Sequence, residues 1–287
     1  MLDFLMMIWY IWIYRDITFG KRSPLCSLAR DVFGVFKIGI VLTVAYQVSH
    51  LILAFDRQFV NVLFSTEDFA VYSFAYNIVS MISTMISSLS IVLLTMLKRA
   101  TKEYILGYYK KSLVVVSAVV GLSLFSYFPL TAFIRWFLPD YYSSLEYVAI
   151  VLPSVLFTSC ITVVMFTVDK VLNMSFAFFK NGCIILLLGL FTNSVAYVVF
   201  KTPQSISYAS LFTMSIWFIL EGLRLGKHTG VKVYKEFFYL LILAFAFVAI
   251  TQSALSVIWS AFAYLIAYLL ITSVMYLYDF KFFLNKR

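Results

Sequence analysis

Polar side chains recur on one face of an otherwise apolar segment, residues 38–58, and of its continuation. Thr43, Gln47, His50, Arg57 and Asn61 follow one another at steps of four, three, seven and four positions. These steps return to the same side of an α-helix. Because bulky polar groups are costly to expose to hydrocarbon, such a face is typical of a helix that borders protein or water. Gln47, His50, Arg57 and Asn61 are therefore candidate residues of a polar path.

The next apolar segment repeats the pattern with smaller side chains. Ser73, Asn77, Ser80, Thr84 and Ser87 are spaced by four, three, four and three positions. Two consecutive helices with one polar face each indicate a shared interior or a water-filled cavity, and Asn77 is the candidate with the larger polar group. Rows of small hydroxyl residues also form close contacts between membrane helices. The pattern leaves both interpretations open for this segment.

The sequence predicts no catalytic centre, metal site or cofactor. Its only histidines are His50 and His228, which excludes an HExxH site. The stretch from Gly222 to His228 has neither the spacing nor the final Ser or Thr of a phosphate-binding loop. The cysteines form no CxxC pair and have no metal-binding spacing: Cys26, Cys160 and Cys183.

Composition indicates which solvent surrounds the chain. Of its 287 residues, 63% are hydrophobic and 12% charged, whereas soluble domains carry about 25% charged residues. A soluble fold cannot hide that much apolar surface, so lipid is the expected solvent. The net charge of +9 is then a sign of membrane topology, and no nucleic-acid partner is predicted. The expected fold class is an all-α, polytopic transmembrane helix bundle.

Eight segments are long enough to span a bilayer, which takes about 20 apolar residues. Two of them contain a proline that is expected to kink the helix, Pro129 and Pro153. The eight are 38–58, 69–97, 112–134, 147–168, 181–200, 206–223, 237–254 and 256–278. We expect four regions. Residues 1–14 form a partial or terminal membrane helix, 15–37 a cytoplasmic linker, 38–223 a six-helix lobe, and 224–287 a peripheral, lipid-facing helix pair with a cytoplasmic tail.

Loop charges predict the orientation. Nineteen of the 22 basic residues fall on one side of the alternating spans, and only Arg57, Arg135 and Lys201 fall on the other. Basic residues concentrate in cytoplasmic loops. The linker 15–37 and the C-terminus are therefore expected in the cytoplasm, and residues 56–57, 67–68 and 136–146 outside.

Three motifs carry a family resemblance. The first is "DRQFVNVLFSTEDFAVYSFAYNI" (56–78), in which an acid–Arg pair, an acidic turn and a Tyr-Ser-x-Ala element follow one another. The others are "LLTMLKRA" (93–100), with Thr95 and Met96 where a proline is usual, and "FLPDYYSS" (137–144). They resemble the seventh-to-eighth helix junction, the exit of helix eight and the external turn after helix nine of polysaccharide (O-antigen type) flippases in the MOP exporter superfamily. The resemblance covers about residues 35–225, and the last two spans fit the extra pair of a fourteen-helix member.

The resemblance implies translocation of an undecaprenyl-diphosphate-linked oligosaccharide across the bacterial inner membrane by alternating access. The ligand would lie between two six-helix lobes. Arg57 would contact the diphosphate or sugar, or pair across the lobes, and Gln47 and Asn77 would bind sugar hydroxyls. Asp56 would pair with a neighbouring base and fix the helix end.

The length departs from the family, because only the C-terminal lobe is represented. The resemblance therefore implies either a fragment or a self-pairing half-transporter. Its expected partners are the N-terminal lobe or a second copy, the lipid bilayer and polysaccharide polymerase machinery. Two alternatives remain open. A small-molecule or drug antiporter of the same superfamily would use intramembrane carboxylates, of which Asp56, Asp169 and Glu221 are the few examples. A membrane enzyme of polysaccharide assembly would need a long external loop with Arg or His, and the external loops here are short.

Overall fold

The computed structural model describes residues 2–18, scattered positions between 33 and 51, and residues 54–98 and 102–284. These residues form helices and no strand, and seven of the helical stretches are long and apolar enough to cross a membrane. The chain is a multi-pass, all-α membrane protein, which confirms the predicted fold class. The seven stretches are 66–97, 104–137, 154–171, 175–200, 203–229, 234–251 and 257–277. About half of the remaining predicted span, 38–58, lies outside the described residues.

The chain divides into two compact units, residues 1–43 and 44–287. In the first unit, α1 (Leu2–Ile13) is followed by the short helix α2 (Arg15–Thr18). Large apolar side chains of α1 are exposed, among them Trp9 and Trp12. An apolar helix with this exposure fits hydrocarbon surroundings, and its role as a partial membrane helix stays a prediction.

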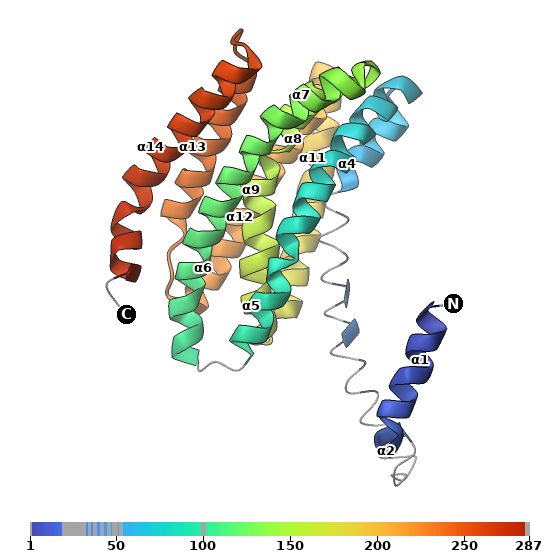
Figure 1. The fold of residues 1–287 in the computed structure, drawn as a ribbon, viewed down its shortest axis with the longest axis vertical. Coiled ribbons are helices and arrows are strands. Elements are labelled where there is room, and N and C mark those ends of the chain that lie inside the picture. Colours follow the sequence, from blue (N-terminus) through green and yellow to red (C-terminus); the bar gives the residue numbers. More distant parts are fainter. Residues whose placement is uncertain are drawn as a thin grey trace. The chain divides into compact units, whose positions relative to one another are not determined.

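The second unit begins with a helical segment, 54–63, and continues as a series of antiparallel helices (Figure 1). Its elements are α4 (Thr66–Ser87), α5 (Leu89–Leu97), α6 (Lys102–Ser123), η1 (Leu124–Ser126), α7 (Tyr127–Phe137), η2 (Pro139–Tyr141), α8 (Ser144–Val151), α9 (Ser154–Ser159), η3 (Cys160–Met165, a π-helical turn), α10 (Phe166–Val171), α11 (Ser175–Phe200), α12 (Pro203–Thr229), α13 (Tyr234–Thr251) and α14 (Val257–Leu284). The helix α12 extends six residues beyond the end expected for that span, so the predicted start of the last region at 224 lies inside this helix.

The loops of the second unit gather at two ends (Figure 1). Loops 64–65, 138–143, 201–202 and 252–256 lie at one end, called here the Trp136 end. Loops 172–174 and 230–233 lie at the other, called the Arg224 end. The order of the helices puts Arg57, Arg135 and Lys201 at the Trp136 end, so the described basic residues of the second unit are separated as the span count predicts.

The stretch 144–171 is the central helix of the second unit. In its window 154–171, 83% of the residues are buried, and α4, α6 and α12 pack around it. Helical hydrogen bonding is interrupted at both predicted prolines. Pro153 separates α8 from α9, and Pro129 follows the 3₁₀ turn η1 at the start of α7. Proline has no N–H to donate to the preceding turn, which explains both breaks.

The helices α13 and α14 lie side by side at one edge of this unit (Figure 1), with α6 and α7 next to α14. Tyrosines of α14 hold this helix against the rest of the unit. The hydroxyls of Tyr264 and Tyr268 donate to the carbonyls of Gly121 and Ala118 of α6, at 2.6 and 2.9 Å. The ring of a buried tyrosine removes apolar area from solvent, and its bonded hydroxyl fixes which face of the helix turns inward. One face of α14 therefore packs on α6, while side chains on the opposite face remain exposed.

Gly222 and Gly226 pack α12 against the turn before α13. A Cβ atom at Gly222 would lie 2.2 Å from Cγ2 of Val233, and one at Gly226 would lie 2.9 Å from the carbonyl oxygen of Val231. Val233 is itself buried, so it has no room to move aside. These two glycines therefore allow the close contact between α12 and the turn before α13.

Replacing Gly222 with alanine is expected to lower the free energy of unfolding by about 1–3 kcal/mol through overpacking. Thermal unfolding of the purified protein in detergent measures the change. Gly107→Ala is the matched control, because a Cβ atom there meets nothing within 4 Å. Since alanine has the higher helix propensity, the control is expected to be neutral or stabilising by up to about 1 kcal/mol. Equal effects of the two substitutions would contradict the packing role.

Candidate functional site

Asp56 joins three helical segments at the Trp136 end of the second unit. Its side chain is 2% exposed. One carboxyl oxygen accepts hydrogen bonds from the hydroxyls of Tyr72 in α4, at 2.9 Å, and Ser210 in α12, at 3.0 Å. The other accepts from the backbone N–H of Arg57 at 2.9 Å. A buried carboxyl with three donors is well compensated, so Asp56 ties segment 54–63 to α4 and α12.

The described partners of Asp56 differ from the base that was expected to pair with it. Among the described residues it binds hydroxyls and a backbone N–H, and no base lies in salt-bridge contact with it. The neighbouring guanidinium of Arg57 points to α4 instead. Consecutive positions on a helix face different directions, which explains why adjacent opposite charges do not meet. The predicted role in fixing the helix end is carried by hydroxyl donors.

Arg57 brings the two predicted polar faces together. Its Nε donates to Oγ of Ser73 at 3.1 Å, and its Nη1 donates to Oδ1 of Asn77 at 3.4 Å. The guanidinium carbon lies 5.7 Å from the ring centre of Phe69, in the range of a cation–π contact. The side chain is half-buried, so part of its donor capacity remains available to a ligand.

The other residues of the predicted polar path are not seen in contact with Arg57. Asn61, four positions after Arg57, is exposed. Gln47 is helical and exposed. His50 lies outside the described residues. Of the predicted path, the described part of the second unit therefore brings together Arg57 and Asn77, with Asp56 beside them.

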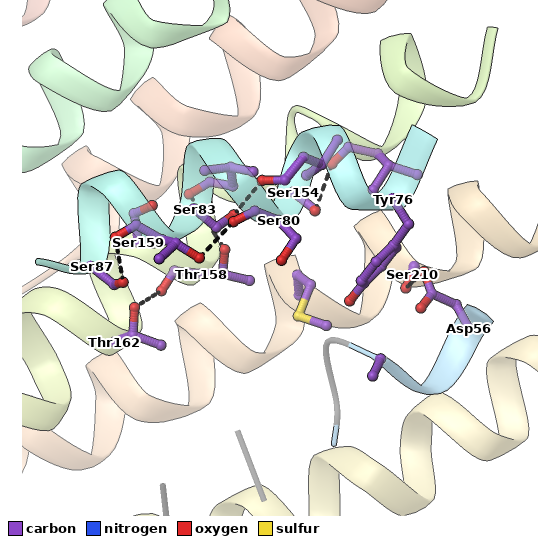
Figure 2. Close-up of a pocket in the computed structure, with 16 residues that line it drawn as sticks. Asp56, Tyr76, Ser80, Ser83, Ser87, Ser154, Thr158, Ser159, Thr162 and Ser210 are labelled. Atoms are coloured by element: carbon purple, nitrogen blue, oxygen red, sulfur yellow. Dashed lines mark hydrogen bonds between the residues drawn. The ribbon is translucent and has the colours of Figure 1, made fainter. Parts of the chain in front are cut away.

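A cavity of about 270 Å³ lies between α4, the α9–η3 segment and α12 (Figure 2). Asp56 and Tyr76 line it near the Trp136 end. Nine serine and threonine residues supply most of its other polar atoms: Ser80, Ser83, Thr84, Ser87, Ser154, Thr158, Ser159, Thr162 and Ser210. None of its described lining residues is Lys, Arg or His. Three members of the second polar face, Ser80, Thr84 and Ser87, thus border a cavity.

Most of these hydroxyls donate their proton to their own helix. Thr84 donates to the carbonyl of Ser80 and Thr162 to that of Thr158, both at 2.8 Å. Ser83, Ser87 and Ser154 make similar bonds three or four residues back along the chain. This back-bonding is a regular habit of hydroxyl residues in helices. It leaves oxygen lone pairs directed at the cavity, so the wall is rich in hydrogen-bond acceptors.

Sequence reasoning missed the second wall of the cavity. Ser154, Thr158 and Thr162 recur at steps of four, the same spacing that identified the face on residues 73–87. Applied to the span 147–168, this test would have found them. Ser159 lies in the same wall, three positions before Thr162, and the π-helical turn at Cys160–Met165 follows it directly. Such turns occur often at functional sites.

A separate buried cluster lies at the Arg224 end. Arg224 of α12 forms salt bridges with Asp169 of α10 and Glu221 of its own helix. Both acids have fully buried side chains, and that of Arg224 is 14% exposed. The predicted span ends at residue 223, whereas the structure places Arg224 in the last turns of α12. Two of the three carboxylates considered for an antiporter are thus already bound by a guanidinium.

No protein-family model matches the chain, and no curated protein or solved structure matches it. The geometry is therefore the basis for assigning a function. Among the described residues, no group of three or more His, Cys, Asp or Glu side chains is arranged to hold a metal ion.

Proposed function

We propose that this protein carries an oligosaccharide-bearing lipid across a bacterial inner membrane, as a flippase of the polysaccharide-exporting type. The observation that supports the proposal is the hydroxyl-lined cavity within a bundle of apolar helices. Polar cavities at membrane depth are costly and mark the path of a polar ligand. A sugar chain needs such a path, because its hydroxyls would otherwise lose their hydrogen bonds in hydrocarbon.

The chemistry of the wall favours the sugar as the part that enters this cavity. Sugar hydroxyls donate hydrogen bonds, and the back-bonded Ser and Thr oxygens accept them. A diphosphate only accepts hydrogen bonds and carries negative charge, so it requires donors or cations. The described lining offers no base and includes the carboxyl of Asp56. In the proposed mechanism the diphosphate stays outside the cavity, and Arg57 is the nearest predicted cation for it.

The proposed setting follows from loop charge and from the resemblance of residues 56–78, 93–100 and 137–144 to flippases of this type. The basic Arg224 end, with the C-terminus, would face the cytoplasm, and the Trp136 end the periplasm. The ligand is an undecaprenyl-diphosphate-linked oligosaccharide. A second lobe, as an N-terminal lobe or a second copy, would complete the path, and polymerase machinery would receive the product.

Removing two hydroxyls from the cavity wall is expected to slow transport. Thr158→Val with Thr162→Val keeps the side-chain shape and removes two acceptors. A lost hydrogen bond of about 1 kcal/mol corresponds to about fivefold, and two such losses to about 25-fold. Surface polysaccharide should therefore form about 25-fold more slowly in complemented deletion cells. Arg57→Ala is expected to act in the same direction.

Thr95→Val is the matched control for this experiment. Thr95 is an exposed, back-bonded threonine of α5 that does not line the cavity. Membrane abundance of all variants is measured in parallel by immunoblot. Normal polysaccharide formation by the double variant at normal abundance would rule out a role for the cavity in transport.

One observation favours a second candidate, a cation-coupled antiporter for small molecules. Asp56 supplies a buried carboxyl to the cavity wall, and such groups are used by transporters to bind a coupling cation. This candidate predicts cation-dependent efflux of a small dye from vesicles, abolished by Asp56→Asn. The flippase proposal predicts no such efflux.

A further inference from the structure

Two further cavities meet at the Trp136 end of the second unit. One, of about 460 Å³, lies between α7, α8, the first turns of α12 and the last turn of α13. The other, of about 570 Å³, lies between α11 and α12. Gln204 and Tyr208 line both of them. These two side chains are therefore a shared wall between the two spaces.

The first of these, called here the head pocket, is polar. Its polar lining residues are Tyr127, Thr131, Tyr142, Glu146, Gln204, Tyr208, Thr251 and Gln252. Tyrosine hydroxyls and glutamine amides both donate and accept hydrogen bonds. Glu146 is the charged member, and no described lining residue is a base. Arg135 lies nearby, with its guanidinium carbon 6.0 Å from the ring centre of Tyr142.

The second, called here the chain groove, is apolar and faces outward from the helices. Phe191, Val195 and Phe200 of α11 and Phe212 of α12 line it, and all four side chains are exposed. In a membrane-spanning helix pair, an open apolar groove lies against hydrocarbon. A hydrocarbon chain fits such a groove well, because it fills the space without unsatisfied polar groups.

Tyr208 of the shared wall accepts a hydrogen bond from a residue that lines the head pocket. Nε2 of Gln252, at the end of α13, donates to the hydroxyl of Tyr208 in α12. The bond links the helix pair α13–α14 to the rest of the second unit beside the head pocket. A ligand that occupies both spaces would contact Tyr208 with its polar part and with the start of its chain.

We propose that the head pocket and the chain groove together bind one lipid with an uncharged, hydroxyl-rich head group, that is, a glycosyl lipid. A sugar both donates and accepts, as the lining does. A phosphate head group would meet a carboxylate and no base in the pocket. An ammonium head group only donates, and it would offer no acceptor to the amide of Gln204 or to the hydroxyl of Tyr208. This site is distinct from the cavity between α4 and α12, and the inference does not depend on the proposed function.

The test uses the full chain, purified in detergent, and competition of lipids for a fluorescent glycosyl-diacylglycerol. Unlabelled glycosyl-diacylglycerol is expected to compete about tenfold better than phosphatidylglycerol or phosphatidylethanolamine of the same chains, since two hydrogen bonds suffice for that difference. A prenyl-phosphate-linked hexose is a further competitor. Tighter binding of this compound would identify the occupant as a transported type of lipid, and weaker binding would identify it as a resident glycolipid, and both results support the site.

Substitutions separate the two parts of the site. Val195→Trp fills the chain groove and is expected to weaken binding about tenfold through lost contact with the chain. Val198→Trp is the matched control, because Val198 is an exposed residue of the same helix that does not line the groove (68% exposed, against 44% for Val195). Gln204→Leu is expected to weaken glycosyl-lipid binding about fivefold, while Arg135→Ala leaves it unchanged.

Three results would overturn the inference. Equal competition by phosphatidylglycerol or phosphatidylethanolamine and by the glycosyl lipid would remove the head-group assignment. Equal losses from Val195→Trp and Val198→Trp would remove the groove. Loss of binding in Arg135→Ala would show that an anionic head group is recognised.

Discussion

Arg224→Ala is expected to lower the free energy of unfolding by about 3–5 kcal/mol, the largest effect of any single substitution considered for this protein. The reason is the environment of its two partners. Asp169 and Glu221 are fully buried, and Arg224 is the cation that bridges them. Removing one side of a buried ion cluster leaves charge without compensation in a medium of low dielectric constant. Thermal unfolding in detergent, or resistance to unfolding by SDS, measures the loss.

A neutral version of the same cluster is the informative comparison. Asp169→Asn and Glu221→Gln, combined with Arg224→Met, remove all three charges at similar volume. This triple variant is expected to recover most of the stability, because a buried ion cluster contributes little net stability over a neutral, packed one. Lys227→Ala, an exposed position on the same helix, serves as the control for loss of a cation. If Arg224→Ala were as mild as Lys227→Ala, the cluster would not hold α10 to α12.

Asp56→Ala is expected to destabilise the protein by about 2–4 kcal/mol. It removes the acceptor of two hydroxyl bonds and leaves the donors of Tyr72 and Ser210 unsatisfied. Asp56→Asn keeps one acceptor oxygen but turns an NH₂ group toward donors, so an intermediate loss is expected. Unfolding temperatures of the purified variants report the order of the two effects.

Glu67→Ala is the matched control for Asp56, because Glu67 is an exposed acid at the start of α4. Its loss is expected to stay within about 0.5 kcal/mol. The account of the Trp136 end would be contradicted by an Asp56→Ala variant that unfolds at the temperature of the Glu67 variant. Since Asp56 also lines the cavity, its variants should lose transport in addition to stability.

The helical spans could be predicted from the sequence because hydrocarbon imposes both their length and their apolar character. The hydroxyl face at residues 73–87 could also be predicted, because the spacing of side chains on one helix depends only on the local sequence. Its placement next to a cavity was one of two open interpretations. The structure resolves these in favour of the cavity for Ser80, Thr84 and Ser87, while Ser73 binds Arg57.

The partners of these residues could not be predicted, because they lie far away along the chain. Ser210 binds Asp56 across 154 positions, and Asp169 binds Arg224 across 55. Hydropathy ended the spans near residues 168 and 223, so Asp169 and Arg224 were taken for residues at or beyond the membrane surface. The helices extend further, because a guanidinium paired with two carboxylates can be buried where an unpaired one cannot.

The proposed movement of a lipid-linked oligosaccharide between leaflets is best tested by finding the leaflet in which that lipid resides. Spheroplasts of cells that lack the gene are treated with an impermeant glycan-labelling reagent, and labelled and total lipid-linked oligosaccharide are compared. The account predicts that the lipid accumulates in the unlabelled, cytoplasmic leaflet. The native gene should restore labelling, and the Thr158→Val, Thr162→Val variant should restore it only weakly. Full labelling in cells that lack the gene would contradict the claim.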